Sequence, residues 1–351
     1  MYNSTYVIMY KYLIILKGHN KDLAIAELKN LWRSYFDERI CLKNIQNTFY
    51  EFYSKHNIES SHEMFNRITY TNVFSREICH VKDIDEFREK VSKLDLSKYD
   101  NQKFLVRIKK SKKNYKVLYN EKELSKIIWE NMRNPKVSIS SPDMEFNFFF
   151  FFYSNEFIFE EKVFENKKNY LQRMPTKRPI SMPYTLKSDM SRCAINLLAI
   201  RGGIILDPFC GIGGILLEAY DMGFDIIAND ISYNDLKYFK QNFKYYFEDK
   251  SPTMILTDAK KQFLKDNTID GIVTDIPYGR CCRRLGDDLY EGFLKSASRY
   301  LKKNKRMVII YANFVNFKDL ALKYFTEVLE VEEYINKSMT RKILVLENSK
   351  K

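Results

Sequence analysis

Residues 207–214 (DPFCGIGG) form the segment of this sequence with the clearest chemical purpose. They end an apolar run and open an amphipathic one, which predicts a turn from a strand into a helix. Gly211, Gly213 and Gly214 remove side chains where a ligand must lie against backbone, and a helix N-terminus offers unpaired N–H groups to a carboxylate. An NAD-type G-x-G-x-x-G pattern fails at Leu216, and no Lys-Ser/Thr pair follows for an ATP-type loop. The segment predicts a site for a different anionic or zwitterionic ligand.

Aspartates end three successive apolar runs: Asp207 the first, Asp230 the second and Asp258 the third. Each alone could cap a helix, but in a doubly wound sheet these strand ends line one crevice. Asp230 could hold ribose hydroxyls, Asp258 could accept from the adenine amine, and Asp207 could face an ammonium. Together they predict S-adenosylmethionine as the cofactor. We assign its pocket to Asp207, Pro208, Phe209, Cys210, Gly211, Gly213, Gly214, Asp230, Ile231, Asp258, Ala259 and Asp275.

The fourth apolar run ends in TDIPY at 274–278, which suits methylation of an amine on a nucleobase. Such an amine is a poor nucleophile because its lone pair is delocalised into the ring, so hydrogen-bond acceptors must turn that lone pair toward the methyl group. The carboxylate of Asp275 and the backbone carbonyl of Ile276 are the expected acceptors, Pro277 keeps residue 276 extended, and Tyr278 stacks on the base. We predict these four as the catalytic residues, with Asp275 taking the proton or passing it to water.

The elements that must position these motifs form a parallel α/β pattern from residue 202 onward. The two last apolar runs, 326–335 and 341–348, are joined by a segment too short for a crossover helix, so they predict a hairpin. A mostly parallel sheet closed by an antiparallel strand is typical of a class I methyltransferase, whereas a dinucleotide dehydrogenase usually ends with another parallel unit. The parallel strands are predicted at 203–209, 225–230, 253–259, 270–278 and 306–313.

The sequence before residue 202 predicts two smaller α+β units. Residues 6–32 read as a strand, a turn and an amphipathic helix. A second unit contains a strand at 103–110, a helix at 122–132 and an apolar run at 144–153. Residues 168–184, which include three prolines, read as a connector.

Composition narrows the class of partner. The 351 residues carry a formal net charge of +13, which favours a polyanion, either nucleic acid or an anionic membrane surface. No apolar run reaches the roughly 20 residues that a membrane span needs, and the N-terminus has no secretion signal, so we expect a cytoplasmic protein without a membrane partner. All four histidines lie within the first 80 residues, and the six cysteines form no C-x-x-C pair. We therefore expect reduced thiols, no metal site, and no Ser-His-Asp catalysis in the C-terminal half.

Several segments together resemble one family. The motifs DPFCGIGG and TDIPYGR, with RPISMP at 178–183 and NPKVSISSPDMEF at 134–146, resemble the archaeal THUMP-domain tRNA methyltransferases that modify N2 of guanosine 10. The resemblance covers nearly the whole chain. The family usually has D-P-P-Y where this sequence has Ile276 in place of the first proline. Because the expected acceptor at that position is a backbone carbonyl, we expect activity to survive.

The resemblance implies a domain order and a substrate. It implies a ferredoxin-like unit at 1–60, a THUMP domain at 61–157 that grips the acceptor end of tRNA, a linker at 158–182, and a class I methyltransferase domain at 183–351. It also implies that a guanosine of tRNA is flipped out and methylated on N2. The predicted RNA contacts lie in a basic run at 107–116 and directly after the TDIPY motif: Arg107, Lys109, Lys110, Lys112, Lys113, Arg280, Arg283 and Arg284.

Other functions stay open at this point. The same amine chemistry serves another tRNA position, guanine in ribosomal RNA, or an adenine or cytosine amine in DNA. A non-catalytic RNA-binding protein with a methyltransferase-like fold is a third class, which the intact aspartates and glycines disfavour. The sequence leaves open whether one or two methyl groups are added, whether a small activator subunit is needed, and what the oligomeric state is.

Overall fold

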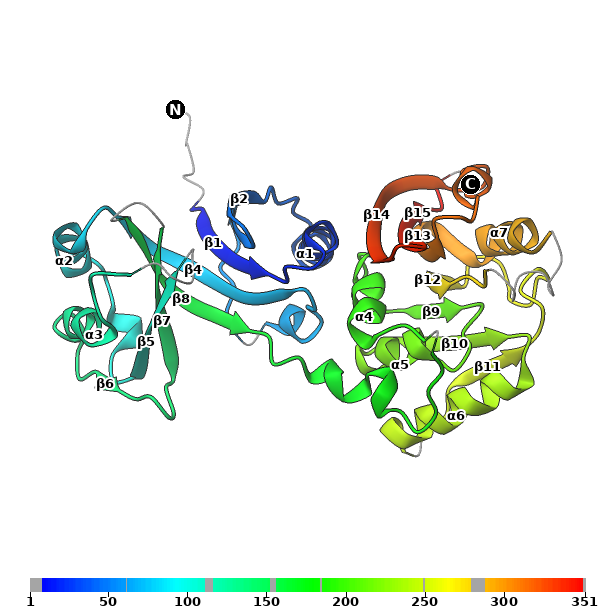
Figure 1. The fold of residues 1–351 in the computed structure, drawn as a ribbon, viewed down its shortest axis with the longest axis horizontal. Helices are drawn as coiled ribbons and strands as arrows, with labels where there is room; N and C mark the ends of the chain where they lie inside the picture. The colour runs from blue at the N-terminus through cyan, green and yellow to red at the C-terminus, as the bar shows by residue number, and fades with distance from the viewer. Residues whose placement is uncertain are drawn as a thin grey trace, which may run out of the picture. The chain divides into compact units, whose positions relative to one another are not determined.

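The computed structural model describes residues 8–60, 62–110, 116–151, 156–183, 185–248, 250–278 and 288–349. The chain divides into two compact units (Figure 1). The first unit comprises Met1–His19, Ile40–Phe65 and Thr71–Asn166, and the second comprises Asn20–Arg39, Asn66–Tyr70 and Lys167–Lys351. No helix in the described parts of the chain contains a stretch long and apolar enough to cross a membrane.

The first unit is built on one eight-stranded sheet with the order β2-β3-β1-β4-β8-β7-β5-β6. The long strands β4 and β8 pair antiparallel at its centre, so the predicted ferredoxin-like and THUMP parts share a continuous sheet. The boundary drawn between them at residue 60 stays a prediction. The strands are β1 Tyr10–Leu16, β2 Lys43–Gln46, β3 Phe49–Ser54, β4 Thr71–Val81, β5 Lys103–Lys110, β6 Lys136–Val137, β7 Met144–Phe150 and β8 Phe157–Glu165.

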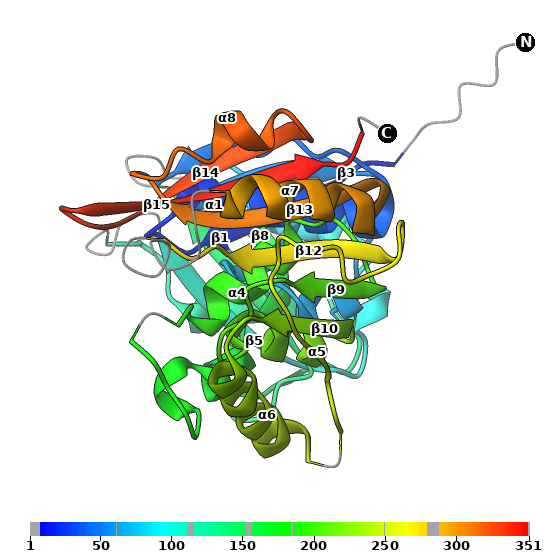
Figure 2. The ribbon, with the colours of Figure 1, turned by 90° about the vertical axis from the view of Figure 1, so that its right-hand side faces the viewer.

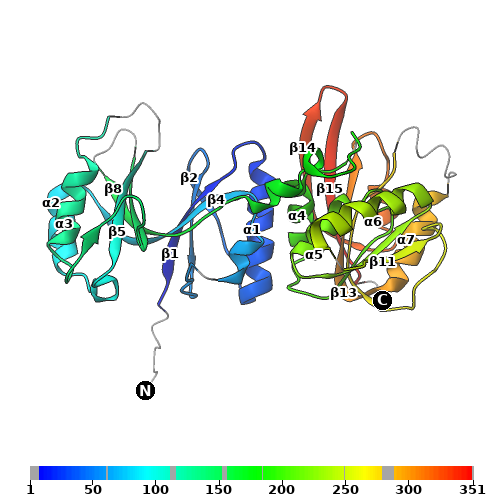
Figure 3. The same cartoon turned by 90° about the horizontal axis from the view of Figure 1, so that it is seen from below.

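Two helices, α2 (Ile84–Ser92) and α3 (Glu121–Trp129), lie together beside β5 in the first unit (Figure 3). Each begins at a polar cap: the side chain of Asp83 accepts from the N–H groups of residues 85 and 86, and Asn120 forms a capping box with Glu123. Their apolar residues bury a cluster of phenylalanine rings, with Phe87 edge-on to Phe148. The predicted strand at 103–110 and the helix beginning near residue 122 are both confirmed.

The second unit is a seven-stranded sheet with the order β11-β10-β9-β12-β13-β15-β14 (Figure 2). β9 to β13 pair in parallel, whereas β15 runs antiparallel to both of its neighbours, which confirms the predicted α/β class and the closing hairpin. The strands are β9 Ile204–Asp207, β10 Asp225–Asp230, β11 Thr253–Leu256, β12 Ile269–Asp275, β13 Leu301–Ala312, β14 Thr326–Asn336 and β15 Met339–Glu347.

Helices cover the sheet of the second unit. Leu206, Ile272 and Leu344 point into the core that α7 and α8 cover, while Gly271, on the alternate face of β12, packs under Leu198, just after α4. β13 begins earlier than the sequence predicts. Leu301 already pairs with Ile269 of β12, and the polar residues 302–305 form a bulge before regular pairing resumes at Arg306. The helices are α4 Ser188–Asn196, α5 Gly214–Asp221, α6 Tyr233–Phe247, α7 Leu289–Tyr300 and α8 Lys318–Ala321.

Helix α1 (Lys21–Phe36), although far away in sequence, belongs to the second unit. Its Glu27 is fully buried and accepts hydrogen bonds from the backbone N–H groups of Thr69 and Tyr70 and from the side-chain amide of Asn196 in α4. Burial raises the pKa of Glu27, and these hydrogen bonds oppose the increase. The predicted N-terminal unit at 1–60 is therefore divided between the two compact units.

Candidate active site

The predicted site residues meet at the carboxyl ends of the parallel strands in the second unit. Asp207 ends β9, Asp230 ends β10 and Asp275 ends β12. The loop after β9 is joined to the end of β10, because the N–H of Cys210 donates to the carbonyl of residue 229 at 2.9 Å. Parallel strands bring these ends to one edge, where the sheet changes its direction of winding at β9 and β12.

Asp230 fixes the shape of the glycine loop. One of its carboxylate oxygens accepts from the N–H of Gly211 at 2.8 Å, and the other accepts from the N–H of Ser232 at 2.9 Å. Burial raises the pKa of Asp230, and these backbone donors act in the opposite direction. Each carboxylate oxygen keeps a second lone pair, so the group can hold the loop and still accept a hydroxyl of a ligand.

The three glycines of the loop have different roles. Gly211 has a φ of 50°, and a Cβ added there would meet nothing within 4 Å, so its backbone faces open space. At Gly213, with a φ of 85°, a Cβ would lie 1.9 Å from the ring of Phe239 in α6. The reason given from the sequence for Gly213 is therefore wrong: its missing side chain makes room for an aromatic ring of the core. Gly214 packs closely against Thr185, so Gly211 is the glycine that offers bare backbone to a ligand.

Asp207 is a buried carboxyl group with two internal donors. The Thr274 hydroxyl donates to it at 2.6 Å and the N–H of Phe209 donates at 3.1 Å. Burial raises the pKa of Asp207 to about 8 against those hydrogen bonds, and the nearby charges of Asp230 and Asp275 raise it further. Three carboxyl groups at one edge of the sheet repel each other when ionised, so this edge favours a ligand that carries positive charge.

Asp275 has an acceptor with no partner. Its Oδ1 is buried and has no hydrogen bond among the described residues, which is costly unless a ligand supplies a donor. Burial raises the pKa of Asp275 to about 7, against the opposing charge of Arg341. The next residue, Ile276, is anchored: its N–H donates to the carbonyl of Ile310 at 3.1 Å and its side chain lies in the core. At the position where the D-P-P-Y pattern has its first proline, Ile276 is held in place by this hydrogen bond and by its contact with the core.

An aromatic pair borders Asp275. Tyr278 meets Phe314 edge-on, with ring centroids 5.9 Å apart, and Phe314 is 60% exposed. Phe314, shortly after the end of β13, was not predicted as a site residue. An aromatic residue that follows an apolar strand could have indicated it. Pro277 is held from the other side, because the Tyr290 hydroxyl donates to its carbonyl at 2.8 Å.

The remaining predicted cofactor residues surround these groups. Asp258 follows β11 and accepts from the N–H of Lys260 at 3.0 Å, so it also caps its own loop. Ile231 is exposed beside Asp230, whereas Ala259 and Cys210 are buried. Burial raises the pKa of the Cys210 thiol well above its usual value, which indicates a packing role. Phe209 meets Phe293 edge-on, and Pro208 accepts from the side chain of Asn229.

The predicted RNA contacts are only partly described. Lys112, Lys113, Arg280, Arg283 and Arg284 lie outside the described residues. Arg107, Lys109 and Lys110 lie on β5 of the first unit, and Arg107 is 3.4 Å from Glu121, so part of its charge is used within that unit.

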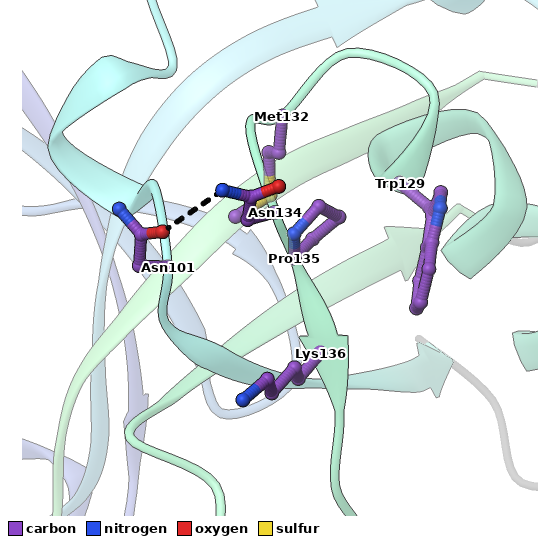
Figure 4. A pocket seen from close by; sticks show the side chains of 6 residues that line it. All are labelled: Asn101, Trp129, Met132, Asn134, Pro135 and Lys136. Carbon is purple, nitrogen blue, oxygen red and sulfur yellow. Dashed lines mark hydrogen bonds between the residues drawn. The ribbon is translucent and has the colours of Figure 1, made fainter.

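The first unit also contains a cavity of about 700 Å³ at the end of α3 (Figure 4). The indole of Trp129, which is 47% exposed, and the amide of Asn101 stand on opposite sides of Asn134 and Pro135. Lys136 adds a cation at the rim. The Asn-Pro-Lys sequence at 134–136 opens one of the segments that carried the family resemblance.

The fold and the site together define a class I methyltransferase joined to a THUMP domain. Residues 175–342 match the family model of the RMKL-like methyltransferase domain, and residues 81–151 match that of the THUMP domain. The residues present fit S-adenosylmethionine, the cofactor of this domain, because the bare backbone at Gly211 and the three carboxyl groups suit a cationic ligand.

The tRNA (guanine(10)-N2)-dimethyltransferase of Methanocaldococcus jannaschii is 30% identical over 276 residues, which are 75% of this chain and 76% of that protein. That of Methanothermobacter thermautotrophicus is 29% identical over 290 residues, 80% of this chain and 83% of the relative. The chain belongs to this family, which confirms the resemblance drawn from its motifs. The crystal structure of TrmN from Thermus thermophilus matches 96% of this chain and 99% of its own, at 16% identity and a TM-score of 0.47.

Substitution of Gly211 tests the cofactor cradle. Gly211→Ala should weaken S-adenosylmethionine binding by at least about tenfold, measured by calorimetry, because a methyl group would occupy the ligand side of the loop. Gly223→Ala is the matched control, since Gly223 also has a left-handed φ and open space at its Cβ. Both variants should lose a similar amount of stability, and equal cofactor affinity in the two would remove Gly211 from the cradle.

Substitution of Asp207 tests the charge of the pocket. The unfolded chain loses this proton near pH 3.8 and the folded chain near pH 8, so the free protein should lose stability as pH rises between these values. Asp207→Asn should therefore raise the free energy of unfolding at pH 8 by roughly 1–3 kcal/mol while weakening cofactor binding about tenfold or more. Urea unfolding and calorimetry at pH 5 and pH 8 measure both effects. A variant less stable at pH 8 would show that the carboxylate is stabilised by its surroundings.

Proposed function

We propose that this protein methylates N2 of guanosine 10 in tRNA, after flipping that nucleotide into the crevice at the end of β12. The observation that supports the proposal is Oδ1 of Asp275, a buried acceptor without a hydrogen-bond partner among the described residues. The position in tRNA rests on the family, whose archaeal members are named for guanine 10.

The chain's own residues would position and activate the amine. Bound S-adenosylmethionine supplies the electrophilic methyl group. The carboxylate of Asp275 accepts one amine N–H and thereby turns the nitrogen lone pair away from the guanine ring. The carbonyl of Ile276 accepts the second N–H, and the hydrogen bond of residue 276 to β13 keeps that carbonyl in place. As the nitrogen becomes positive, Asp275 stabilises the charge and takes the proton or passes it to water.

Base flipping follows from the burial of this acceptor. A guanine stacked and paired in a helix cannot bring its N2 amine to an atom hidden from solvent, so the nucleotide must leave the stack. Tyr278 and the exposed ring of Phe314 would replace the lost stacking energy.

The first unit would hold the tRNA elsewhere. Its cavity combines an exposed indole, two amide side chains and a lysine, which suits an unpaired nucleotide whose base stacks on Trp129. The basic strand β5 of the same unit would add phosphate contacts. The cytoplasmic location stays a prediction from the sequence, and whether a small activator subunit is needed stays open.

The direct test is incubation of unmodified tRNA with the full chain and labelled cofactor, followed by nucleoside analysis and mapping of the methylated nucleotide. N2-methylated guanosine at position 10 is the expected product, and the ratio of mono- to dimethylated nucleoside gives the number of transfers. Label at another nucleotide, in ribosomal RNA or in DNA would overturn the assignment to guanosine 10.

Asp275→Asn should reduce kcat for tRNA at least about 100-fold, because the charged acceptor is lost, while cofactor affinity stays within tenfold. In the unaltered chain kcat should rise with pH up to about 7 and then level off, since Asp275 ionises there. Asp270→Asn, at the opposite end of β12, is the control and should keep the activity. Unchanged turnover in Asp275→Asn would remove Asp275 from the mechanism.

Trp129→Ala should weaken tRNA binding by about 1–3 kcal/mol, the usual contribution of a stacked base, without changing cofactor binding. Tyr245→Ala removes a ring that is more exposed, on α6, and serves as the control. Filter binding at several salt concentrations measures both variants. Affinity should fall steeply with salt in each, because phosphate contacts persist; equal affinities would exclude the cavity from tRNA binding.

A further inference from the structure

Arg341 lies on the same face of the sheet as Asp275. On β15, Leu344 and Leu346 belong to the core under α7, so Arg341 and Ile343 project to the opposite face. On β12, Ile272 and Ile276 belong to that same core, so Asp275 also projects to the opposite face. β13 separates the two strands, and its residue directly opposite Arg341 is the small Ala312.

The guanidinium of Arg341 is held by one ion pair, but not all of its N–H donors have an acceptor. Its Nη1 donates to Glu333 on β14 at 2.7 Å. Its Nε is buried and has no hydrogen-bond partner among the described residues. Asp275 is not that partner: the described residues contain no ion pair between the two groups. A buried donor left unpaired costs free energy unless a ligand satisfies it.

The face therefore carries an unsatisfied acceptor and an unsatisfied donor two strands apart. Asp275 pairs with Ile310 on β13, whereas Arg341 pairs with Ala312, two residues further along the same strand. Strand spacing and rise therefore put the backbones of Asp275 and Arg341 on the order of 12 Å apart. On this face of β13, the residue opposite Arg341 contributes only the methyl group of Ala312. The ligand that satisfies both groups must present donors on one side and an acceptor on the other.

The Watson–Crick edge of guanine has this pattern: N1–H and the N2 amine are donors, and O6 is an acceptor. We propose that Arg341 donates to O6 of the target guanine while Asp275 accepts from its N2 amine, which makes Arg341 a specificity-determining residue. The inference rests on the proposed function. A base with an amine at C6 would place donors against the guanidinium, which can only donate.

The identity of Arg341 matters for this role. An arginine stays charged and holds its donors in a rigid plane, and the ion pair with Glu333 sets the orientation of that plane. A neutral or flexible side chain would not give the same discrimination. The charge of Arg341 also acts on Asp275, where it lowers the pKa of the carboxyl group against the larger effect of burial.

The test compares two substrates that both carry an amine at C2: tRNA with guanosine and tRNA with 2,6-diaminopurine at the target position. The full chain should prefer guanosine by about 10- to 100-fold in kcat/KM, as expected for a well-placed pair of base contacts. Arg341→Gln should reduce that preference to within about threefold, because its amide can donate or accept. A purely structural role would lower both rates and leave their ratio unchanged.

Lys342→Gln is the matched control, because Lys342 is the next residue on β15, has the same charge and pairs with Glu330 and Glu332 instead. It should keep the preference for guanosine. If Arg341→Gln does not fold, the ratio of kcat/KM on the two substrates for the unaltered chain still tests the proposal. Equal values on the two substrates would overturn the role of Arg341. Absence of any guanosine methylation by the unaltered chain would instead overturn the proposed function.

Discussion

The second unit is organised around the confinement of three carboxyl groups at one edge of its sheet. Asp207, Asp230 and Asp275 end three parallel strands, and burial raises the pKa of each. Such an arrangement destabilises the free protein when the groups ionise, so the surrounding structure must hold them by other means. It does so with backbone N–H donors from the glycine loop, with the Thr274 hydroxyl, and with strand pairing on both sides of β9 and β12.

The three carboxyl groups of this edge differ in how many of their hydrogen-bond acceptors are already used within the protein. Asp207 and Asp230 have internal donors and keep limited capacity for a ligand, whereas Oδ1 of Asp275 has none. A cofactor with positive charge would relieve the first two groups, and an incoming amine would satisfy the third.

Local sequence was enough to predict the strands whose ends carry these carboxyl groups. The strand ends at Asp207, Asp230 and Asp275 and the final hairpin followed from apolar runs and the residues that end them. What depended on distant residues could not be predicted. Gly213 is required because the ring of Phe239, from another helix, occupies the place of its side chain. The position of Arg341 beside β13 depends on strand pairing with residues far away in sequence. The residues around Gly213 and Arg341 in the sequence give no indication of these distant neighbours.

The way α1 is packed has a consequence for how the protein can be divided. The carboxylate of Glu27 binds the backbone of residues 69 and 70, and Arg306 donates to Asn30, so two separate N-terminal segments complete the second unit. A fragment that begins at the connector would lack both segments and would leave the buried amide of Asn196 without its acceptor on α1. A single cut at the connector therefore separates the sheet that carries the site from two segments that complete its unit.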